Sequence, residues 1–187
     1  MTRTIIGLSG NLDRPSKTRT LVQTVVARVA SEFHATGTIY DLADFGPSLG
    51  AARRVTDLDA PARAALEVIL AADALVVGSP VYKGSYTGLF KHLIDLIDPL
   101  ALVGKPILLT ATGGGDRHAL VIEHQLRPLF GFFEAQTLPT GVYAADRDFT
   151  NGQPTSPAVT DRLGRAVAQL TPYLSRRALP EVFLLGA

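Results

Sequence analysis

The sequence predicts a doubly wound α/β fold, in which a five-stranded parallel sheet with strand order 2-1-3-4-5 carries helices on both faces. Short apolar segments alternate with segments of helical periodicity along the 187 residues, and this alternation is typical of parallel sheets covered by helices. Five strands and five helices in this sequence match the doubly wound arrangement. Since no repeat, linker or low-complexity stretch divides the chain, we predict a single domain over residues 1–178.

Each predicted element has its own signal in the sequence. The expected strands are apolar runs at about 4–9, 38–42, 73–78, 106–111 and 137–142. The first helix begins near Thr18, and its apolar face is formed at helical spacing by Leu21, Val25, Val29 and Phe33. Asp59 is the expected N-cap of a helix that runs to about residue 71, with Pro61 in its first turn. Further helices are expected over about 85–97, 116–134 and 158–176, and loops over 43–55 and 144–157.

The last nine residues, 179–187, form an apolar tail beyond the final predicted helix. Two interpretations of this tail stay open. It packs on a neighbouring subunit, or it folds on its own domain or has no fixed structure.

The composition excludes several classes of function. The chain has no cysteine, which excludes disulfides, thiolate catalysis and iron–sulfur clusters. A net charge of +1 gives no general reason to expect nucleic acid or an anionic membrane as a partner. The four histidines lack the spacing of a metal-ligand set, so we expect no metal site. Since there is no signal-peptide pattern and no apolar run of about 20 residues, we expect a cytoplasmic protein.

Three polar, glycine-bearing loops follow three of the predicted strands. They are Gly10–Thr18, Gly78–Ser85 and Thr112–His118. In an open parallel sheet, ligands bind beyond the carboxyl ends of the strands, at the point where the strand order reverses. We therefore expect the first two loops to meet at that point, with the third beside them, so that all three surround one ligand.

The first loop has the chemistry of a phosphate site. It leads into a helix N-terminus, where free backbone N–H groups and the helix dipole favour an anion. Asn11, Ser16 and Thr18 add neutral donors, while Lys17 and Arg19 add positive charge. The loop lacks both the Gly-x-x-x-x-Gly-Lys-Ser/Thr and the Gly-x-Gly-x-x-Gly patterns, which disfavours ATP hydrolysis and Rossmann-type dinucleotide binding. A purely structural turn capped by Ser16 or Thr18 is the alternative.

The second and third loops are suited to a planar ring. Pro80 stiffens the second loop, and Tyr82 can present a flat face to a ring, although it could equally be a surface aromatic. The third loop has three consecutive glycines, which let backbone N–H groups approach a ligand edge closely, unless the loop is simply flexible. Such donors would stabilise the negative charge that builds up on a flavin during reduction. A phosphate at one end and a planar heteroaromatic ring at the other describe FMN.

At these residues the sequence resembles the NADPH-dependent FMN reductase family. The resemblance covers nearly the whole chain. Its motifs are Gly10…Pro15-Ser16-x-Thr18, Ser79-Pro80-Val81-Tyr82-Lys83-x-x-Tyr86-x-Gly88, Thr112-Gly113-Gly114…His118 and Leu126-Arg127-Pro128-Leu129. The sequence is most similar to the branch of flavin reductases that serve two-component alkanesulfonate and methanesulfonate monooxygenases.

The resemblance implies a flavodoxin-like fold, a homodimer or homotetramer, and reduction of FMN by NADPH, with NADH as the other candidate. It also implies release of reduced flavin to a partner monooxygenase in sulfonate-sulfur assimilation. By position, three residues of the first loop would hold the phosphate: Asn11, Ser16 and Thr18. The isoalloxazine ring would be bordered on one side by Pro80, Val81, Tyr82 and Lys83. Its other side would be bordered by Thr112, Gly113, Gly114 and His118.

One position departs from the alkanesulfonate reductases. Their helix after the third loop carries an inserted tyrosine, associated with a π-bulge at the subunit interface, whereas His124 stands there in this chain. In this respect the sequence is more similar to the methanesulfonate-type reductases. Because π-bulges often mark functional sites, His124 is a candidate for tuning flavin retention or subunit contacts. A histidine on the helix surface or at an interface, without such a role, is the alternative.

The expected reaction is hydride transfer from the nicotinamide to the flavin. It needs the two rings stacked at about 3–3.5 Å but no protein acid, base or nucleophile, so we predict no catalytic side chain. The carboxylates Asp95, Asp98 and Glu123 are interpreted as helix-surface or interface charges. The alternative enzyme retains FMN and reduces a quinone, an azo dye or chromate. A flavodoxin-like electron carrier is disfavoured, because the near-neutral chain offers no strongly acidic docking face.

Overall fold

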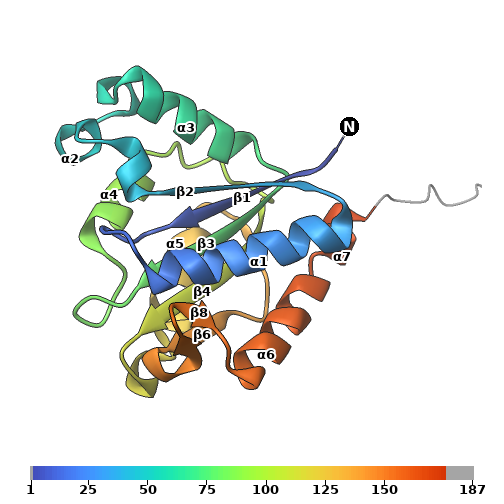
Figure 1. Cartoon of the computed structure of the whole chain (residues 1–187). Coiled ribbons are helices and arrows are strands. Elements are labelled where there is room, and N and C mark those ends of the chain that lie inside the picture. Colours follow the sequence, from blue (N-terminus) through green and yellow to red (C-terminus); the bar gives the residue numbers. More distant parts are fainter. Residues whose placement is uncertain (1, 176–187) are drawn as a thin grey trace, which may run out of the picture.

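A computed structural model describes residues 2–175 and has one parallel sheet between two layers of helices. The strand order is β2-β1-β3-β4, with β5 and β6 both paired to β4 on its other side (Figure 1). The strands are β1 Thr4–Ser9, β2 Thr36–Asp41, β3 Ala74–Pro80, β4 Pro106–Gly113, β5 Gln136–Thr137 and β6 Val142–Ala145. This confirms the predicted doubly wound, flavodoxin-like order, with the fifth position shared by two short strands.

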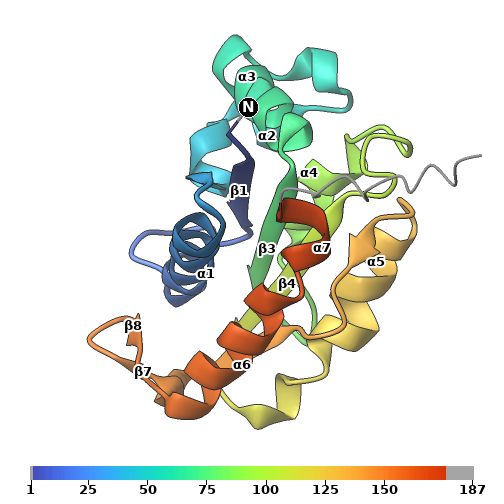
Figure 2. The same cartoon turned by 90° about the vertical axis from the view of Figure 1, so that its right-hand side faces the viewer.

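The helices lie on the two faces of the sheet, as Figure 2 shows with α1 on one side and α4 and α5 on the other. Their bounds are α1 Lys17–Phe33, α2 Ser48–Ala51, α3 Ala60–Ala71, α4 Gly88–Asp95, α5 Arg127–Gly131, α6 Pro157–Ala168 and α7 Thr171–Leu174. One apolar core lies under α1 and α6, and the other lies under α3, α4 and α5. Both faces of the central strands are therefore buried, which is why those strands read as continuous apolar runs.

The prediction of one continuous fifth strand over 137–142 is wrong in its middle, where the structure has two short strands with a break between them. The chain leaves the ladder between β5 and β6, because Pro139 has no N–H to donate to it. Arg127 binds the carbonyl oxygens of Leu138 at 2.8 Å and Pro139 at 3.2 Å. These hydrogen bonds replace the missing ladder contacts and hold the break in place.

The helix predicted over 116–134 is divided into three parts. It begins with a 3-10 turn at Asp116–His118, continues as a π-helix over Ile122–Leu126, and ends as α5. The backbone N–H of Arg127 bonds to the oxygen of Ile122, five residues back. The next residue is Pro128, whose ring cannot accommodate an α-helical carbonyl four residues before it, and this accounts for the wider turn. His124 lies in the centre of that π-helix.

The other differences are local. Helix 85–97 begins later than predicted, at Gly88, because residues 82–85 form a tight turn. The last predicted helix ends at Ala168 and is followed by α7, whose second residue is Pro172. The expected loops contain short 3-10 turns, the short helix α2, and a hairpin of β7 Phe149–Thr150 with β8 Gln153–Pro154. The predicted tail 179–187 lies outside the described residues, and among those described no helix is long and apolar enough to cross a membrane.

Candidate functional site

The three predicted loops meet at the carboxyl edge of the sheet. Gly10 donates its N–H to the oxygen of Gly78 at 2.7 Å, which joins the first loop to the second. Val81 donates to the oxygen of Thr112 at 2.8 Å, which joins the second loop to the third. The hydroxyls of Thr18 and Thr112 are 2.6 Å apart in a buried contact that joins the first loop to the third. The loops therefore form one connected surface at the switch point of the sheet.

The first loop presents the N-terminus of α1. Ser16 caps this helix, and its hydroxyl accepts the N–H of Arg19 at 3.3 Å. The first N–H groups of a helix have no partner within it, and the positive end of the helix dipole lies at the same place. Lys17 pairs with Asp146 at 2.8 Å, so this cation ties the loop to the segment after β6. A 17-residue helix thus places an anion-binding terminus at the expected end of the ligand site.

Asn11 has a different role from the simple donor that the sequence predicts. Its side chain is buried, and its amide nitrogen binds the oxygen of Asp13 at 3.0 Å and the carboxylate of Asp41 at 3.3 Å. Its Oδ1 is buried and has no partner among the described residues, and the same holds for the Ser9 hydroxyl. Two buried polar atoms at the end of β1 are therefore available to a ligand or an ordered water.

Asp41 is a site residue that sequence reasoning missed. It ends β2, its side chain is fully buried, and it receives hydrogen bonds from Asn11, Arg14 and Arg19. Burial alone would raise the pKa of this carboxyl, but the hydrogen bonds from Arg14 and Asn11 outweigh burial and hold the pKa below its ordinary value. In the sequence, Asp41 lies within the predicted strand 38–42, and a single aspartate near the end of that strand was the only signal.

The second loop is a tight hairpin turn that presents Tyr82. Tyr82 and Ser85 exchange both backbone hydrogen bonds, while Lys83 and Gly84 have positive φ angles of 51° and 87°. Two residues of positive φ are the signature of a type I′ turn, which explains the glycine. Tyr82 is 48% exposed, so its ring is available to a ligand or a partner. The Ser85 hydroxyl donates to Gln125 at 3.0 Å, which connects the turn to the π-helix.

The third loop has one glycine that the protein itself requires and two that it does not. A Cβ at Gly113 would lie 2.5 Å from the hydroxyl of Tyr143, which donates to the oxygen of Gly115 at 2.6 Å. A Cβ at Gly114 would meet only a carboxylate oxygen of Asp146, at 3.9 Å, and one at Gly115 would meet nothing within 4 Å. The open space beside the last two glycines is the space that a close-approaching ligand edge would need.

The two histidines that the sequence singled out line one small cavity. His118 accepts a hydrogen bond from Arg117 at 3.1 Å, and His124 projects from the π-helix. The cavity has a volume of about 170 Å³ and is lined by Gly84, Arg117, His118, Leu120, Val121, His124 and Gln125. It joins the tip of the second loop to the π-helix, at the edge of the three-loop surface.

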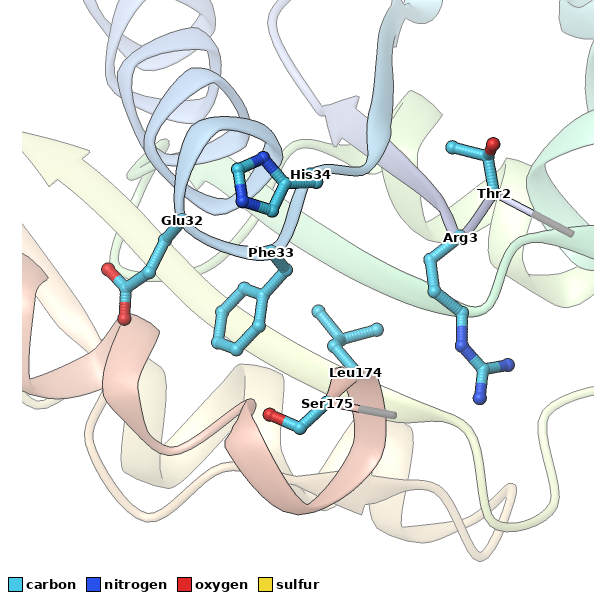
Figure 3. Close-up of a pocket in the computed structure, with 7 residues that line it drawn as sticks. All are labelled: Thr2, Arg3, Glu32, Phe33, His34, Leu174 and Ser175. Carbon is cyan, nitrogen blue, oxygen red and sulfur yellow. The ribbon is translucent and has the colours of Figure 1, made fainter. Parts of the chain in front are cut away.

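A larger cavity lies elsewhere in the part of the chain that the structure describes. It measures about 1050 Å³, and Figure 3 shows its lining of Thr2, Arg3, Glu32, Phe33, His34, Leu174 and Ser175. These residues come from the start of β1, the end of α1 and the end of α7, so the cavity is at the opposite edge of the sheet from the loops. It borders the limits of the described chain at both ends. Over residues 2–175, no three side chains that could bind a metal are gathered together.

The model of one protein family, described as NADPH-dependent FMN reductase, matches residues 3–150. The chain belongs to this family. Its members act on FMN with a nicotinamide cofactor, and this identifies the chain as an oxidoreductase of the flavin-reductase type, as the resemblance of its loop motifs implied.

Relatives and solved structures support the same assignment. The chain is 46% identical over 176 residues to "NADH-dependent FMN reductase SfnF" of Pseudomonas fluorescens, covering 94% of each chain. It is 44% identical over 174 residues to "FMN reductase (NADPH)" of Pseudomonas aeruginosa, covering 93% of this chain and 94% of the relative. A solved structure of NADH:FMN oxidoreductase (EmoB) superposes with a TM-score of 0.83 at 28% identity, covering 95% of this chain and 92% of the other.

Several features of the three connected loops suit a ligand such as FMN. Gly114 and Gly115 adjoin open space. Near the first loop, two buried polar atoms have no partner among residues 2–175, and the capped N-terminus of α1 belongs to the same loop. The residues present therefore fit FMN.

Proposed function

We propose that this protein transfers hydride from a nicotinamide cofactor to FMN and supplies the reduced flavin to a separate monooxygenase of sulfonate metabolism. The observation that carries the proposal is the meeting of the three loops at the switch point, in a chain of the FMN reductase family. The sulfonate link rests on the SfnF and SfnE relatives, which are 41–46% identical to this chain. The bound FMN would supply a ring that accepts a hydride.

The phosphate end of the site would be held by the first loop. The backbone N–H groups at the start of α1 and the hydroxyl of Ser16 are the direct donors in this proposal. Thr18 shares its hydroxyl with Thr112, which leaves one of the two hydroxyl hydrogens for a ligand. Asn11 would contribute mainly by shaping the loop, because its amide nitrogen is already used within the protein.

The ring end would lie between the second and third loops. Pro80, Val81, Tyr82 and Lys83 would border one side of the ring, while Thr112, Gly113, Gly114 and His118 would border the other. The backbone donors of the third loop would stabilise negative charge on the ring, and the protein would exclude water and fix the stacking. No side chain is needed to move a proton during hydride transfer, so we assign no general acid or base.

Both NADH and NADPH are candidates for the nicotinamide cofactor. The names of the relatives specify NADH in one case and NADPH in another. We propose that Tyr82, which is accessible from solvent, would border the nicotinamide ring when the cofactor binds.

We also propose that two copies of this chain associate through the face formed by α4 and α5. A groove of about 480 Å³ lies there, lined by Lys91, Ile94, Asp95, Ile97, Pro99, Leu129, Phe132 and Phe133. Phe132 is 68% exposed and stacks edge-to-face on Phe133, with 5.2 Å between ring centroids. A large exposed aromatic on an apolar groove is typical of an interface. A second copy of this chain is its occupant in this proposal, in line with the homodimer or homotetramer that the family resemblance implies.

The function is tested by asking whether FMN behaves as a substrate. Protein freed of flavin should oxidise NADH or NADPH with a rate that saturates in FMN, and the flavin should separate from the protein on desalting. A flavin that stays bound through desalting, with ping-pong kinetics towards a quinone or an azo dye, would instead identify the FMN-retaining alternative.

A further inference from the structure

The carboxylate of Asp41 is the point at which the first loop is attached to the sheet. Asp41 lies at the end of β2, and its side chain is fully buried. Arg14 reaches it through Nε and Nη2, both at 2.6 Å, and Arg19 reaches it through Nε at 2.9 Å. Asn11 adds a contact at 3.3 Å. The start of the loop, its middle and the first turn of α1 therefore converge on one buried group.

The same contacts leave unused donors on both arginines, whose side chains are 45% and 30% exposed. Asp41 and Asp44 bind Nε and Nη2 of Arg14, and Asp41 binds only Nε of Arg19. Among the described residues, Nη1 of Arg14 and both Nη groups of Arg19 have no hydrogen-bond partner. Because a guanidinium is planar, fixing one of its edges also fixes the direction of its remaining N–H groups. Such fixed donors suit phosphate oxygens.

Asp41 is itself fixed by its surroundings. Its carboxylate accepts the N–H of Ala43 at 3.0 Å, and its own N–H donates to Asp44 at 2.9 Å in a capping box. The negative charges of Asp41 and Asp44 balance the positive charges of Arg14 and Arg19. The cluster around the buried carboxylate is therefore close to neutral. A buried charge with this many partners has one defined geometry, and it imposes that geometry on the groups bound to it.

We propose that Asp41 is a positioning residue for the flavin phosphate: it holds the first loop and the guanidinium groups of Arg14 and Arg19 in the arrangement that receives the phosphate. This inference rests on the proposed FMN site and adds to it a residue outside the three loops. Asp41 does not touch the ligand and acts through the loop.

Riboflavin has the same ring and ribityl chain as FMN but no phosphate. Comparing the two flavins therefore separates a role of Asp41 in phosphate binding from a role in the general stability of the site. The test is titration of oxidised FMN and of riboflavin into the protein, followed by flavin fluorescence, with no nicotinamide present. In Asp41→Asn, which preserves the shape of the side chain but removes its charge, Kd for FMN should rise about tenfold, as expected for losing one or two charge-assisted hydrogen bonds. Kd for riboflavin should stay at its wild-type value.

The matched control is Asp73→Asn. Asp73 also pairs with an arginine, Arg3, at 2.7 Å, and it also accepts a backbone N–H, from Thr4 at 2.8 Å. It lies at the opposite edge of the sheet, so its replacement should leave both flavin dissociation constants unchanged. Thermal melts of both variants report any general loss of stability.

Three results would overturn the proposal: equal weakening of FMN and riboflavin, no change in either, or tighter binding of FMN. The last result would mean that Asp41 keeps the arginines away from the phosphate. If Asp41→Asn does not fold, the same two dissociation constants, for FMN and for riboflavin, are compared in Arg14→Lys. Lysine keeps the positive charge but cannot bind Asp41 through two nitrogens. A wild-type protein that binds neither flavin would count against the proposed function itself, which the titration separates from the role of Asp41.

Discussion

The glycines of the third loop allow a sharp test of the ligand site, because the protein needs one of them and the ligand needs another. In Gly114→Ala, the new Cβ would meet only Asp146, at 3.9 Å, and Gly114 is not among the glycines with positive φ. The folded protein should therefore accept the methyl group, and stability should be unchanged or higher by up to about 1 kcal/mol, since alanine restricts the unfolded chain.

Binding of FMN should nevertheless weaken in Gly114→Ala. A methyl group in the open space beside the loop would keep the flavin edge from the backbone donors, and losing one such hydrogen bond costs about 1 kcal/mol, or about fivefold in Kd. Fluorescence titration with FMN and with riboflavin measures this loss, which should be the same for both because they share the ring. An unchanged Kd for both flavins would refute the placement of the ring against this loop.

Gly113→Ala is the matched comparison. Its Cβ would lie 2.5 Å from the Tyr143 hydroxyl, so that side chain must move and give up its hydrogen bond to Gly115. We expect a loss of about 1–2 kcal/mol in the free energy of unfolding, which lowers Tm by about 2–8 °C in a chain of this size. A melting temperature equal to that of Gly114→Ala would contradict the assignment of distinct roles to the two glycines.

Three further predictions follow from individual contacts. Thr87 is buried, caps α4 and donates to the oxygen of Gly10 at 2.8 Å, so Thr87→Ala should lower the free energy of unfolding in urea by about 1–2 kcal/mol. Thr87→Ser should restore most of this loss. An unchanged denaturation midpoint in Thr87→Ala would refute the role of this contact. Because the pKa of Asp41 is lower in the folded state, ionised Asp41 stabilises the fold fully above its unfolded pKa, and this contribution is lost as the pH falls below about 4. Below that pH, the Tm of Asp41→Asn should therefore decline less steeply than the Tm of the wild type. Phe132→Asp should yield a smaller species in light scattering than the wild type, and an unchanged mass would exclude the α4–α5 face as the interface.

The sheet was predictable because its signals are local. The strands β1, β3 and β4 are continuous apolar runs, and each ends in a loop rich in glycine and polar residues, so both the strand order and the site edge follow from the sequence. The cap at Asp59 and the helix start near Thr18 depend on neighbouring residues alone. The structure confirms the cap and begins the helix at Lys17, one residue earlier than predicted.

The parts that could not be predicted depend on distant contacts. The break between β5 and β6 is held by Arg127, and the π-helix depends on how Pro128 is accommodated against the core. Asn11 reads as a free donor in the sequence, but it is committed to Asp41, which is 30 residues away. Asp41 itself lies within the predicted strand 38–42 and gives no sign of its partners there. Only the folded chain brings Arg14 and Arg19 to it.

The central claim is that this chain reduces FMN with a nicotinamide cofactor, and one measurement tests it most directly. The initial rate of NADH and NADPH oxidation is followed at 340 nm with flavin-free protein, with and without added FMN. The account predicts turnover with at least one of the two cofactors that depends on FMN and saturates with it. No oxidation of either cofactor in the presence of FMN, FAD or riboflavin would contradict it.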